Sequence, residues 1–262
     1  MRASVVIRVR DEAAALRRLL ALLEAQRAPH EVVVVDSGSV DASPAVAEAA
    51  GARLLRVPAA EFTFGRALNR GADACAAEVV VALSAHAFPR DDAWLERMAA
   101  ALDDPAVACA FGPERDWAGR PLGAPVRQDA ALLRAHPEWG YSNGAGAFRA
   151  SLWRERPFRE DLTGTEDREW ALWALEERGR VCLLDPALAV DHDHARDPLR
   201  QTFARARREA RGYAAFLDLP PYGVRDAARE WWADQGWHRS RARARLDPRR
   251  VARLAGKWAG SR

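Results

Sequence analysis

The chain has 262 residues, of which 49% are hydrophobic and 29% charged, and its formal net charge is +3. This apolar content is enough for one large α/β domain, or for a domain with a smaller extension, and it excludes a disordered chain. No segment has the ~18 uncharged apolar residues of a spanning helix, and charged residues interrupt the N-terminal apolar stretch. The three cysteines form no Cys-x-x-Cys pair, so we expect reduced thiols and a cytoplasmic protein.

Short apolar segments alternate with helical patterns through the first 90 residues. Strands are expected at 4–9, 31–36, 53–58 and 79–83, and helices at 12–26, 44–51 and 66–77. The four consecutive valines at 32–35 are typical of a strand buried on both faces of a parallel sheet. This alternation predicts an α/β fold with a mainly parallel, doubly wound sheet.

The pattern is less regular beyond residue 94. We expect a helix at 91–103, strands at 106–112 and 181–185, loops at 113–125 and 140–153, and an acidic helix at 166–178. An amphipathic basic helix at 199–217 is followed by a tail rich in Trp and Arg. Residues 196–262 hold 17 Arg plus Lys and 7 Asp plus Glu, a net of +10, so the remaining residues sum to −7. This segment favours phosphates, nucleic acid or an acidic membrane surface, and a solvated basic tail explains it equally well.

Ligands of open parallel sheets bind beyond the carboxyl ends of the strands. Four positions meet this condition here: residues 8–12 after the first strand, 36–41 after the second, the loop after Pro58, and 84–86 after the fourth. Because these ends share one edge of the sheet, we expect a common pocket there.

Three segments, in this order, resemble one enzyme family. Residues 31–43, EVVVVDSGSVDAS, are similar to the Val-Asp-x-Gly-Ser-x-Asp segment of family 2 glycosyltransferases. Residues 62–95 resemble the rhamnosyltransferase-like branch of that family, and residues 158–179 its acidic Glu-Asp stretch. The resemblance implies a GT-A catalytic domain over 1–198, with a basic, Trp-rich helical extension over 199–262. It also implies inverting transfer from a nucleotide-diphosphate sugar, with dTDP-rhamnose as a candidate donor, to a cell-surface polysaccharide or a lipid-linked acceptor.

The resemblance assigns the donor site residue by residue. Asp36 corresponds to the acidic residue that contacts the nucleoside, and Ser37 stands where many relatives carry a second aspartate. Asp41 could reach the same site or cap the helix that begins near Pro44. The other expected contacts with the nucleotide sugar are Arg8, Glu12, Asn69, Ser84, Asn143 and Arg208.

A divalent cation usually neutralises the diphosphate in this fold, held by an Asp-x-Asp motif. Ser84-Ala85-His86 occupies that place here, and His86 matches the second half of an Asp-x-His variant. By the same resemblance, His192 would complete the metal site. Imidazole ligands favour Mn²⁺ over Mg²⁺. The alternative is that His86 contacts the phosphates directly and the site works without metal.

Inverting transfer needs a carboxylate that deprotonates the acceptor hydroxyl. Asp167 corresponds to the catalytic aspartate of the family, and Glu166 is expected to orient it or to contact the acceptor. Both carboxylates could instead only stabilise the start of the helix at 166–178.

Other classes fit the sequence less well. The single lysine, Lys257, argues against a nucleotide-sugar pyrophosphorylase, and no GxxxxGK motif indicates a P-loop. The acidic first 195 residues match no nucleic-acid recognition module, so no nucleic-acid partner is expected. Two hypotheses remain: an active transferase at the inner face of the membrane, with its Trp-rich tail in peripheral contact with lipid, or a degenerate GT-A domain that binds a sugar nucleotide or a partner.

Overall fold

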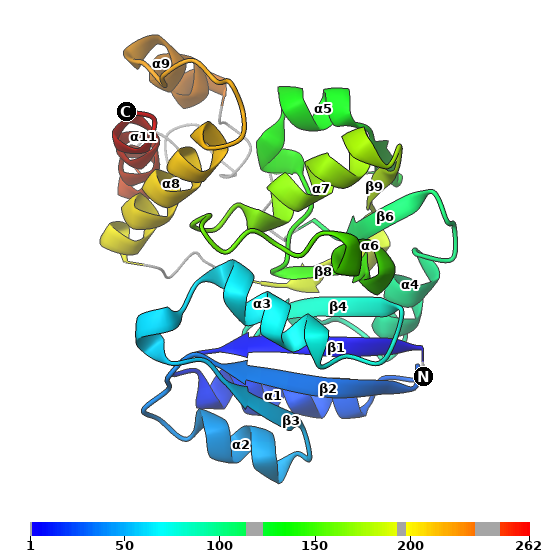
Figure 1. Cartoon of the computed structure of the whole chain (residues 1–262). Coiled ribbons are helices and arrows are strands. Elements are labelled where there is room, and N and C mark those ends of the chain that lie inside the picture. Colours follow the sequence, from blue (N-terminus) through cyan, green and yellow to red (C-terminus); the bar gives the residue numbers. More distant parts are fainter. Residues whose placement is uncertain (1, 114–122, 193–197, 234–246) are drawn as a thin grey trace.

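An eight-stranded sheet forms the centre of the computed structural model, which describes residues 2–113, 123–192, 198–233 and 247–262 (Figure 1). The strand order is β3-β2-β1-β4-β8-β6-β9-β7. A short antiparallel ribbon of two further strands, β5 and β10, lies beside it. The strands are β1 Ala3–Val9, β2 His30–Asp36, β3 Arg53–Arg56, β4 Val79–Ser84, β5 Phe88–Pro89, β6 Val107–Phe111, β7 Val126–Gln128, β8 Ala145–Arg149, β9 Val181–Leu184 and β10 Val190–Asp191.

The N-terminal half of the sheet is parallel, as predicted: β1 pairs in parallel with β2 and β4, and β2 with β3. Strand β8 then runs antiparallel to both of its neighbours, β4 and β6. The prediction of a loop over 140–153 was therefore wrong, because residues 145–149 form a central strand. The glycines suggested a loop, but Gly146 has another role. A Cβ at this position would lie 2.6 Å from the Tyr141 ring, so the glycine permits close packing inside the sheet.

Helices cover both faces of the sheet (Figure 1). Two hydrophobic cores result, one on each face of the sheet. On one face, side chains of β1, β2 and β4 pack against α1, α2 and α4. On the other face, the alternate side chains of the same strands pack against α3, α6 and α7. The strands are thus buried on both faces, as the valine run predicts. The helices are α1 Ala13–Glu24, α2 Ser43–Ala49, α3 Phe64–Asp73, α4 Trp94–Ala100, α5 Ala130–Ala135, α6 Ala150–Glu155 and α7 Glu166–Glu177, with short 3₁₀ turns at Ala59–Glu61, Pro137–Trp139 and Pro186–Leu188.

The C-terminal part is helical, as predicted, with α8 Leu199–Ala214, α9 Val224–Ala233 and α11 Pro248–Gly260. Two glycines of α11 let it approach α8 closely, since an added Cβ at Gly256 would meet the Phe203 carbonyl and one at Gly260 the Arg207 carbonyl. Helix α9 is tied to α11 by the ion pair of Glu230 with Lys257, at 2.8 Å. Within the described ranges, no helix has the length and apolar character needed to cross a membrane.

Helix α8 is also packed against the start of α7. Gly212 lies so close to Thr165 that an added Cβ would overlap the Thr165 side chain. This contact places the polar side of α8 over the carboxyl ends of the central strands, so the C-terminal segment becomes one wall of the cavity there.

Candidate functional site

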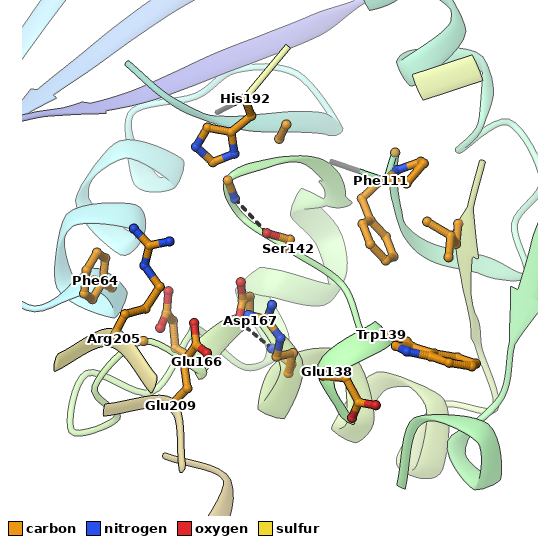
Figure 2. Close-up of a pocket in the computed structure, with 18 of the residues that line it drawn as sticks. Phe64, Phe111, Glu138, Trp139, Ser142, Glu166, Asp167, His192, Arg205 and Glu209 are labelled. Atoms are coloured by element: carbon orange, nitrogen blue, oxygen red, sulfur yellow. Dashed lines mark hydrogen bonds and ion pairs between the residues drawn. The ribbon is translucent and has the colours of Figure 1, made fainter. Parts of the chain in front are cut away.

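A cavity of about 280 Å³ lies at the carboxyl end of β1, between the sheet, the start of α7 and α8. Figure 2 shows Glu166, Arg205 and Glu209 gathered on one side of it and Phe111 and Trp139 on the other. Phe64 lies on the same side as Arg205, and Glu138 lies beside Trp139, so each side combines aromatic and charged side chains. The residues that line it include Arg8, Phe64, Phe111, Glu138, Trp139, Glu166, Asp167, His192, Arg205, Arg208 and Glu209.

Asp167 is a buried carboxylate with hydrogen bonds to both oxygens. Its Oδ2 accepts a hydrogen bond from the Asn143 backbone N–H at 3.0 Å, and its Oδ1 accepts from the Arg168 backbone N–H at 2.9 Å and the Arg168 guanidinium at 3.0 Å. Asp167 lies in the first turn of α7. The carboxylate is thus held rigidly at the cavity wall.

Glu166 has a different environment. Its side chain is 2% exposed, and its Oε2 atom makes no hydrogen bond within the described ranges. Burial, reinforced by the adjacent charge of Asp167, raises the pKa of Glu166 to about 7, although the Arg8 guanidinium opposes the shift. Two adjacent carboxyls therefore differ: Asp167 is held by hydrogen-bond donors, and Glu166 can hold a proton near neutral pH.

Two guanidinium groups flank one aromatic ring in the same wall. The Cζ atoms of Arg8, from β1, and Arg208, from α8, lie 5.2 and 5.3 Å from the centre of the Phe64 ring. The Nε–H groups of both arginines are buried and have no acceptor within the described ranges. Burial lowers the pKa of Arg208, which means that its charge is incompletely compensated by the protein. The pair thus presents donors and positive charge to a ligand in the cavity.

Asn143 connects these groups. Its backbone carbonyl accepts a hydrogen bond from Arg8 at 3.3 Å, and its backbone N–H donates to Asp167. The side chain is 1% exposed, yet neither its amide nitrogen nor its oxygen has a partner in the described part of the chain. Buried amides normally have partners. Asn143 itself does not line the cavity, but its neighbours Ser142 and Gly144 do.

The rings of the two predicted metal ligands lie close together and are tilted relative to each other. The ring centres of His86 and His192 are 4.7 Å apart, with an angle of 39° between the planes. Strand pairing produces this approach, because Phe88 of β5 is the register partner of Asp191 in β10. His86 Nδ1 lies 2.6 Å from Glu12 Oε1.

This donor set fits a cation that the protein and a diphosphate would bind together. Across the described ranges there is no group of three or more His, Cys, Asp or Glu side chains placed to hold a metal alone. His86 and His192 would supply two nitrogen ligands, and oxygen atoms of a diphosphate or water would supply the rest. The next two residues, Asp193 and His194, lie outside the described residues.

The other predicted donor contacts do not line this cavity. Asp36 is buried, and its carboxylate accepts from the backbone N–H groups of Gly38 and Ser39 at 3.2–3.3 Å. Ser37, also buried, and Ser84 are held by backbone bonds at the strand ends: Ser37 N–H donates to Val9 and Ser84 N–H to Gly144. These residues lie at the same edge of the sheet as the cavity, but their observed bonds are internal.

Asn69 lies elsewhere, in a separate depression on the α3 side. Its amide nitrogen donates to the Phe158 carbonyl at 2.9 Å and to Glu160 at 3.2 Å. Its amide oxygen accepts from Trp153 Nε1 and the Phe158 N–H, both at 3.0 Å. The side chain is thereby engaged in joining α3 to the segment before α7.

Sequence reasoning did not assign a role to several residues of the site. Arg168 follows Asp167 and Glu209 follows Arg208 in the chain, and this proximity to predicted residues is the only sequence signal for them. Burial raises the pKa of Glu209, which faces the arginines of the same wall. Trp139 is 37% exposed at the cavity and stacks on His136 with ring centres 4.3 Å apart, and no local motif announces it.

Comparison with known proteins identifies the family. The model of glycosyl transferase family 2 matches residues 4–155, which is more than half of the chain. The chain belongs to glycosyltransferase family 2.

Two curated relatives of this family 2 chain are each 30% identical to it. One is a TPR repeat-containing protein of Synechococcus elongatus, aligned over 199 residues, and the other is the pre-mycofactocin glycosyltransferase of Mycobacterium tuberculosis, aligned over 217 residues. The alignments cover 76% and 77% of this chain but only 44% of each relative. The chain thus spans less than half the length of these curated relatives.

Solved structures confirm the GT-A glycosyltransferase fold. The mannosyltransferase PcManGT of Pyrobaculum calidifontis, in complex with GDP-Man and Mn²⁺, has a TM-score of 0.70 at 21% identity, covering 99% of this chain and 85% of its own. Glucosyl-3-phosphoglycerate synthase of Mycobacterium tuberculosis, with Mn²⁺, UDP and glucosyl-3-phosphoglycerate, has a TM-score of 0.62 at 21% identity, covering 85% and 82%. S. aureus TarS 1-349 has a TM-score of 0.60 at 16% identity, covering 98% and 89%.

Proposed function

We propose that this family 2 chain transfers a sugar from a nucleotide-diphosphate sugar to a hydroxyl acceptor, with inversion at the anomeric carbon. One observation carries the proposal: buried polar atoms of Arg8, Asn143, Glu166 and Arg208 surround or adjoin a single cavity and make no hydrogen bond within the described ranges. Native proteins leave few buried polar groups unpaired, so such a cluster supports a polar, anionic ligand. Arg8, Arg208 and Asn143 contribute hydrogen-bond donors, and only Glu166 contributes a carboxylate. This excess of donors favours a diphosphate.

The donor is proposed to place its diphosphate between Arg8 and Arg208 on one side and His86 and His192 on the other. Guanidinium groups bind phosphate oxygens through charge-assisted hydrogen bonds. A divalent cation bound by the two imidazoles would stabilise the charge that develops on the departing diphosphate, with Mn²⁺ suited better than Mg²⁺. A site without metal, in which His86 contacts the phosphates directly, is the alternative.

The nucleoside is proposed to bind beyond the end of β2, near Asp36 and Ser37. The resemblance of residues 62–95 to the rhamnosyltransferase-like branch makes dTDP-rhamnose the first donor to test. Glu12, Ser84 and Asn143 remain proposed members of the donor site. The side chain of Asn69 is engaged by Phe158 and Trp153, so we propose that it stabilises the fold near the donor site without contacting the nucleotide.

Asp167 is proposed as the base and Glu166 as its partner at the acceptor. The acceptor hydroxyl oxygen attacks the anomeric carbon, the bond from that carbon to the diphosphate oxygen breaks, and its electron pair leaves with the diphosphate. The hydroxyl proton passes to the Asp167 carboxylate. The rigid support of Asp167 by Asn143 and Arg168 suits this role, because a base must be held within hydrogen-bond reach of the proton it takes.

The acceptor is proposed to be a cell-surface polysaccharide precursor or a lipid-linked sugar, met at the inner face of the membrane. The C-terminal extension over 199–262, which we distinguish from the catalytic domain over 1–198, would make the lipid contact. Trp232 and Trp258 are 59% and 43% exposed, and the Arg262 guanidinium lies 4.2 Å from the Trp258 ring centre. Exposed tryptophan beside arginine suits an acidic lipid surface.

Thermal stabilisation by UDP, dTDP and GDP, each with Mn²⁺, Mg²⁺ or EDTA, tests the donor site. No stabilisation by any of them would refute the function, and stabilisation that EDTA leaves unchanged would remove the metal. Asp167→Asn should abolish transfer and keep nucleotide binding, with Asp161→Asn, an exposed carboxylate outside the cavity, as control. Nucleotide binding by the wild type without transfer to any glycan acceptor would favour the degenerate binding domain.

A further inference from the structure

The segment at the position of the metal motif lacks a carboxylate, but a carboxylate from a neighbouring turn lies beside it. Ser84-Ala85-His86 contains no acidic residue, yet Glu12 Oε1 lies 2.6 Å from His86 Nδ1. Glu12 comes from the turn between β1 and α1, 74 residues away in the sequence. The parallel pairing of β1 with β4 brings the two turns together, because Arg8 and Ser84 are register partners at the end of both strands.

The turn that carries Glu12 is firmly held. Asp11 adopts a left-handed backbone conformation, with φ of 54°, which costs a non-glycine residue about 1 kcal/mol or more. Hydrogen bonds offset this cost: Asp11 N–H donates to Ser39 Oγ at 2.9 Å, and Asp11 Oδ1 accepts from Val40 N–H at 2.7 Å. Glu12 N–H donates to Ser43 Oγ at 3.1 Å. The position of Glu12 is therefore determined by two cross-linked turns.

The contact determines which nitrogen of His86 carries the hydrogen. In a hydrogen bond between an imidazole nitrogen and a carboxylate oxygen, the oxygen accepts, so the donor in this contact is Nδ1–H. In the neutral imidazole, the lone pair then lies on Nε2, on the far side of the ring from Glu12. The close approach of the His86 and His192 rings places both imidazoles at one point of the site.

We propose that Glu12 is a positioning residue: it holds His86 in the Nδ1–H tautomer, so that Nε2 serves the cation and the diphosphate of the donor. This inference rests on the proposed function and changes the role of Glu12 from nucleotide contact to support of His86. Carboxylate–histidine pairs of this kind orient the ligand and raise its basicity, and their loss typically weakens metal binding by about 10- to 100-fold.

Two measurements test the proposal, with Glu12→Ala, Glu12→Gln and the control Glu48→Gln. Glu48 is an exposed carboxylate of α2, 3.8 Å from Arg56, and does not line the cavity. Nitrogen-15 spectra of histidine-labelled protein without ligand report the tautomer of His86. We expect the Nδ1–H tautomer in the wild type, a mixture in Glu12→Ala, and the wild-type pattern in Glu48→Gln.

Electron paramagnetic resonance then follows Mn²⁺ binding in the presence of UDP, dTDP or GDP. The affinity should fall about 10- to 100-fold in Glu12→Ala and less in Glu12→Gln, which keeps an acceptor oxygen. The proposal is overturned if wild-type His86 is the Nε2–H tautomer, if Glu12→Ala leaves the tautomer unchanged, or if Mn²⁺ affinity is unchanged. If the wild type binds no Mn²⁺ with any nucleotide, the metal role in the proposed function fails, and the tautomer spectra still decide whether Glu12 positions His86.

Discussion

Glu166→Gln gives a stability test of the site that needs no substrate. The side chain is buried at the start of α7, and burial beside Asp167 raises its pKa from 4.5 to about 7. The folded state therefore binds this proton more tightly than the unfolded chain does. Between pH 4.5 and about 7, the unfolded chain has lost the proton and the folded state still holds it.

Glu166 should stabilise the folded protein at low pH and lose this effect at high pH. The stabilising contribution of the protonated Glu166 is fully present below its unfolded pKa of 4.5 and is lost as the pH rises through about 7. The difference between these two values corresponds to about 3 kcal/mol of unfolding free energy. Wild-type stability should thus fall by that order relative to a variant that cannot ionise.

The assay is urea unfolding of the wild type and Glu166→Gln at pH 5 and pH 8, without nucleotide. Glutamine adds a difference in stability that is the same at both pH values, because its amide also needs a partner in the buried site. The quantity to compare is therefore the change in the difference between the two proteins. We expect the variant to gain about 2.5 kcal/mol over the wild type between pH 5 and pH 8.

Glu48→Gln is the control, since Glu48 is an exposed carboxylate of α2, 3.8 Å from Arg56, and does not line the cavity. The difference between this variant and the wild type gives the baseline at each pH. A Glu166→Gln difference that is flat from pH 5 to pH 8 would show that Glu166 is already ionised at pH 5 and that burial does not perturb it.

Three further predictions concern binding and packing. Arg208→Ala should weaken nucleoside diphosphate binding about 10- to 100-fold by calorimetry, because it removes a charged donor to phosphate, and Arg200→Ala at the exposed start of α8 should not. Gly212→Val should destabilise the fold by about 1–3 kcal/mol in thermal unfolding and weaken nucleotide binding, because the larger side chain forces α8 away from Thr165. Unchanged binding would show that the position of α8 does not matter for the nucleotide. Asn69→Ala should lower stability by about 2 kcal/mol while nucleotide affinity persists, and a selective loss of affinity would place Asn69 at the donor after all.

Sequence reasoning anticipated much of the fold and the gathering of the site. The alternation of strands and helices predicted the parallel half of the sheet, because these strands are buried on both faces and their hydrophobic runs are local. Arg8, Glu166, Asp167, His192 and Arg208 were named from motifs, and all five line one cavity. Their chemical roles remain proposals.

The middle of the chain was harder to predict. Strand β8 contains small residues and two glycines nearby, which are typical of loops, yet it forms the centre of the sheet. Its pairing with β4 and β6 joins segments at least 34 residues apart, and no local pattern encodes such a choice.

The amino-acid sequence by itself determined the family, the parallel half of the sheet and the residue types that meet at its edge, since these depend on short motifs and local periodicity. Only the tertiary structure decided how those side chains are paired. Glu12 contacts His86, burial beside Asp167 raises the pKa of Glu166, and α8 brings Arg208 to Phe64. The contacts of Glu12 with His86 and of Arg208 with Phe64 join segments that are distant in the sequence, and strand pairing or helix packing brings them together.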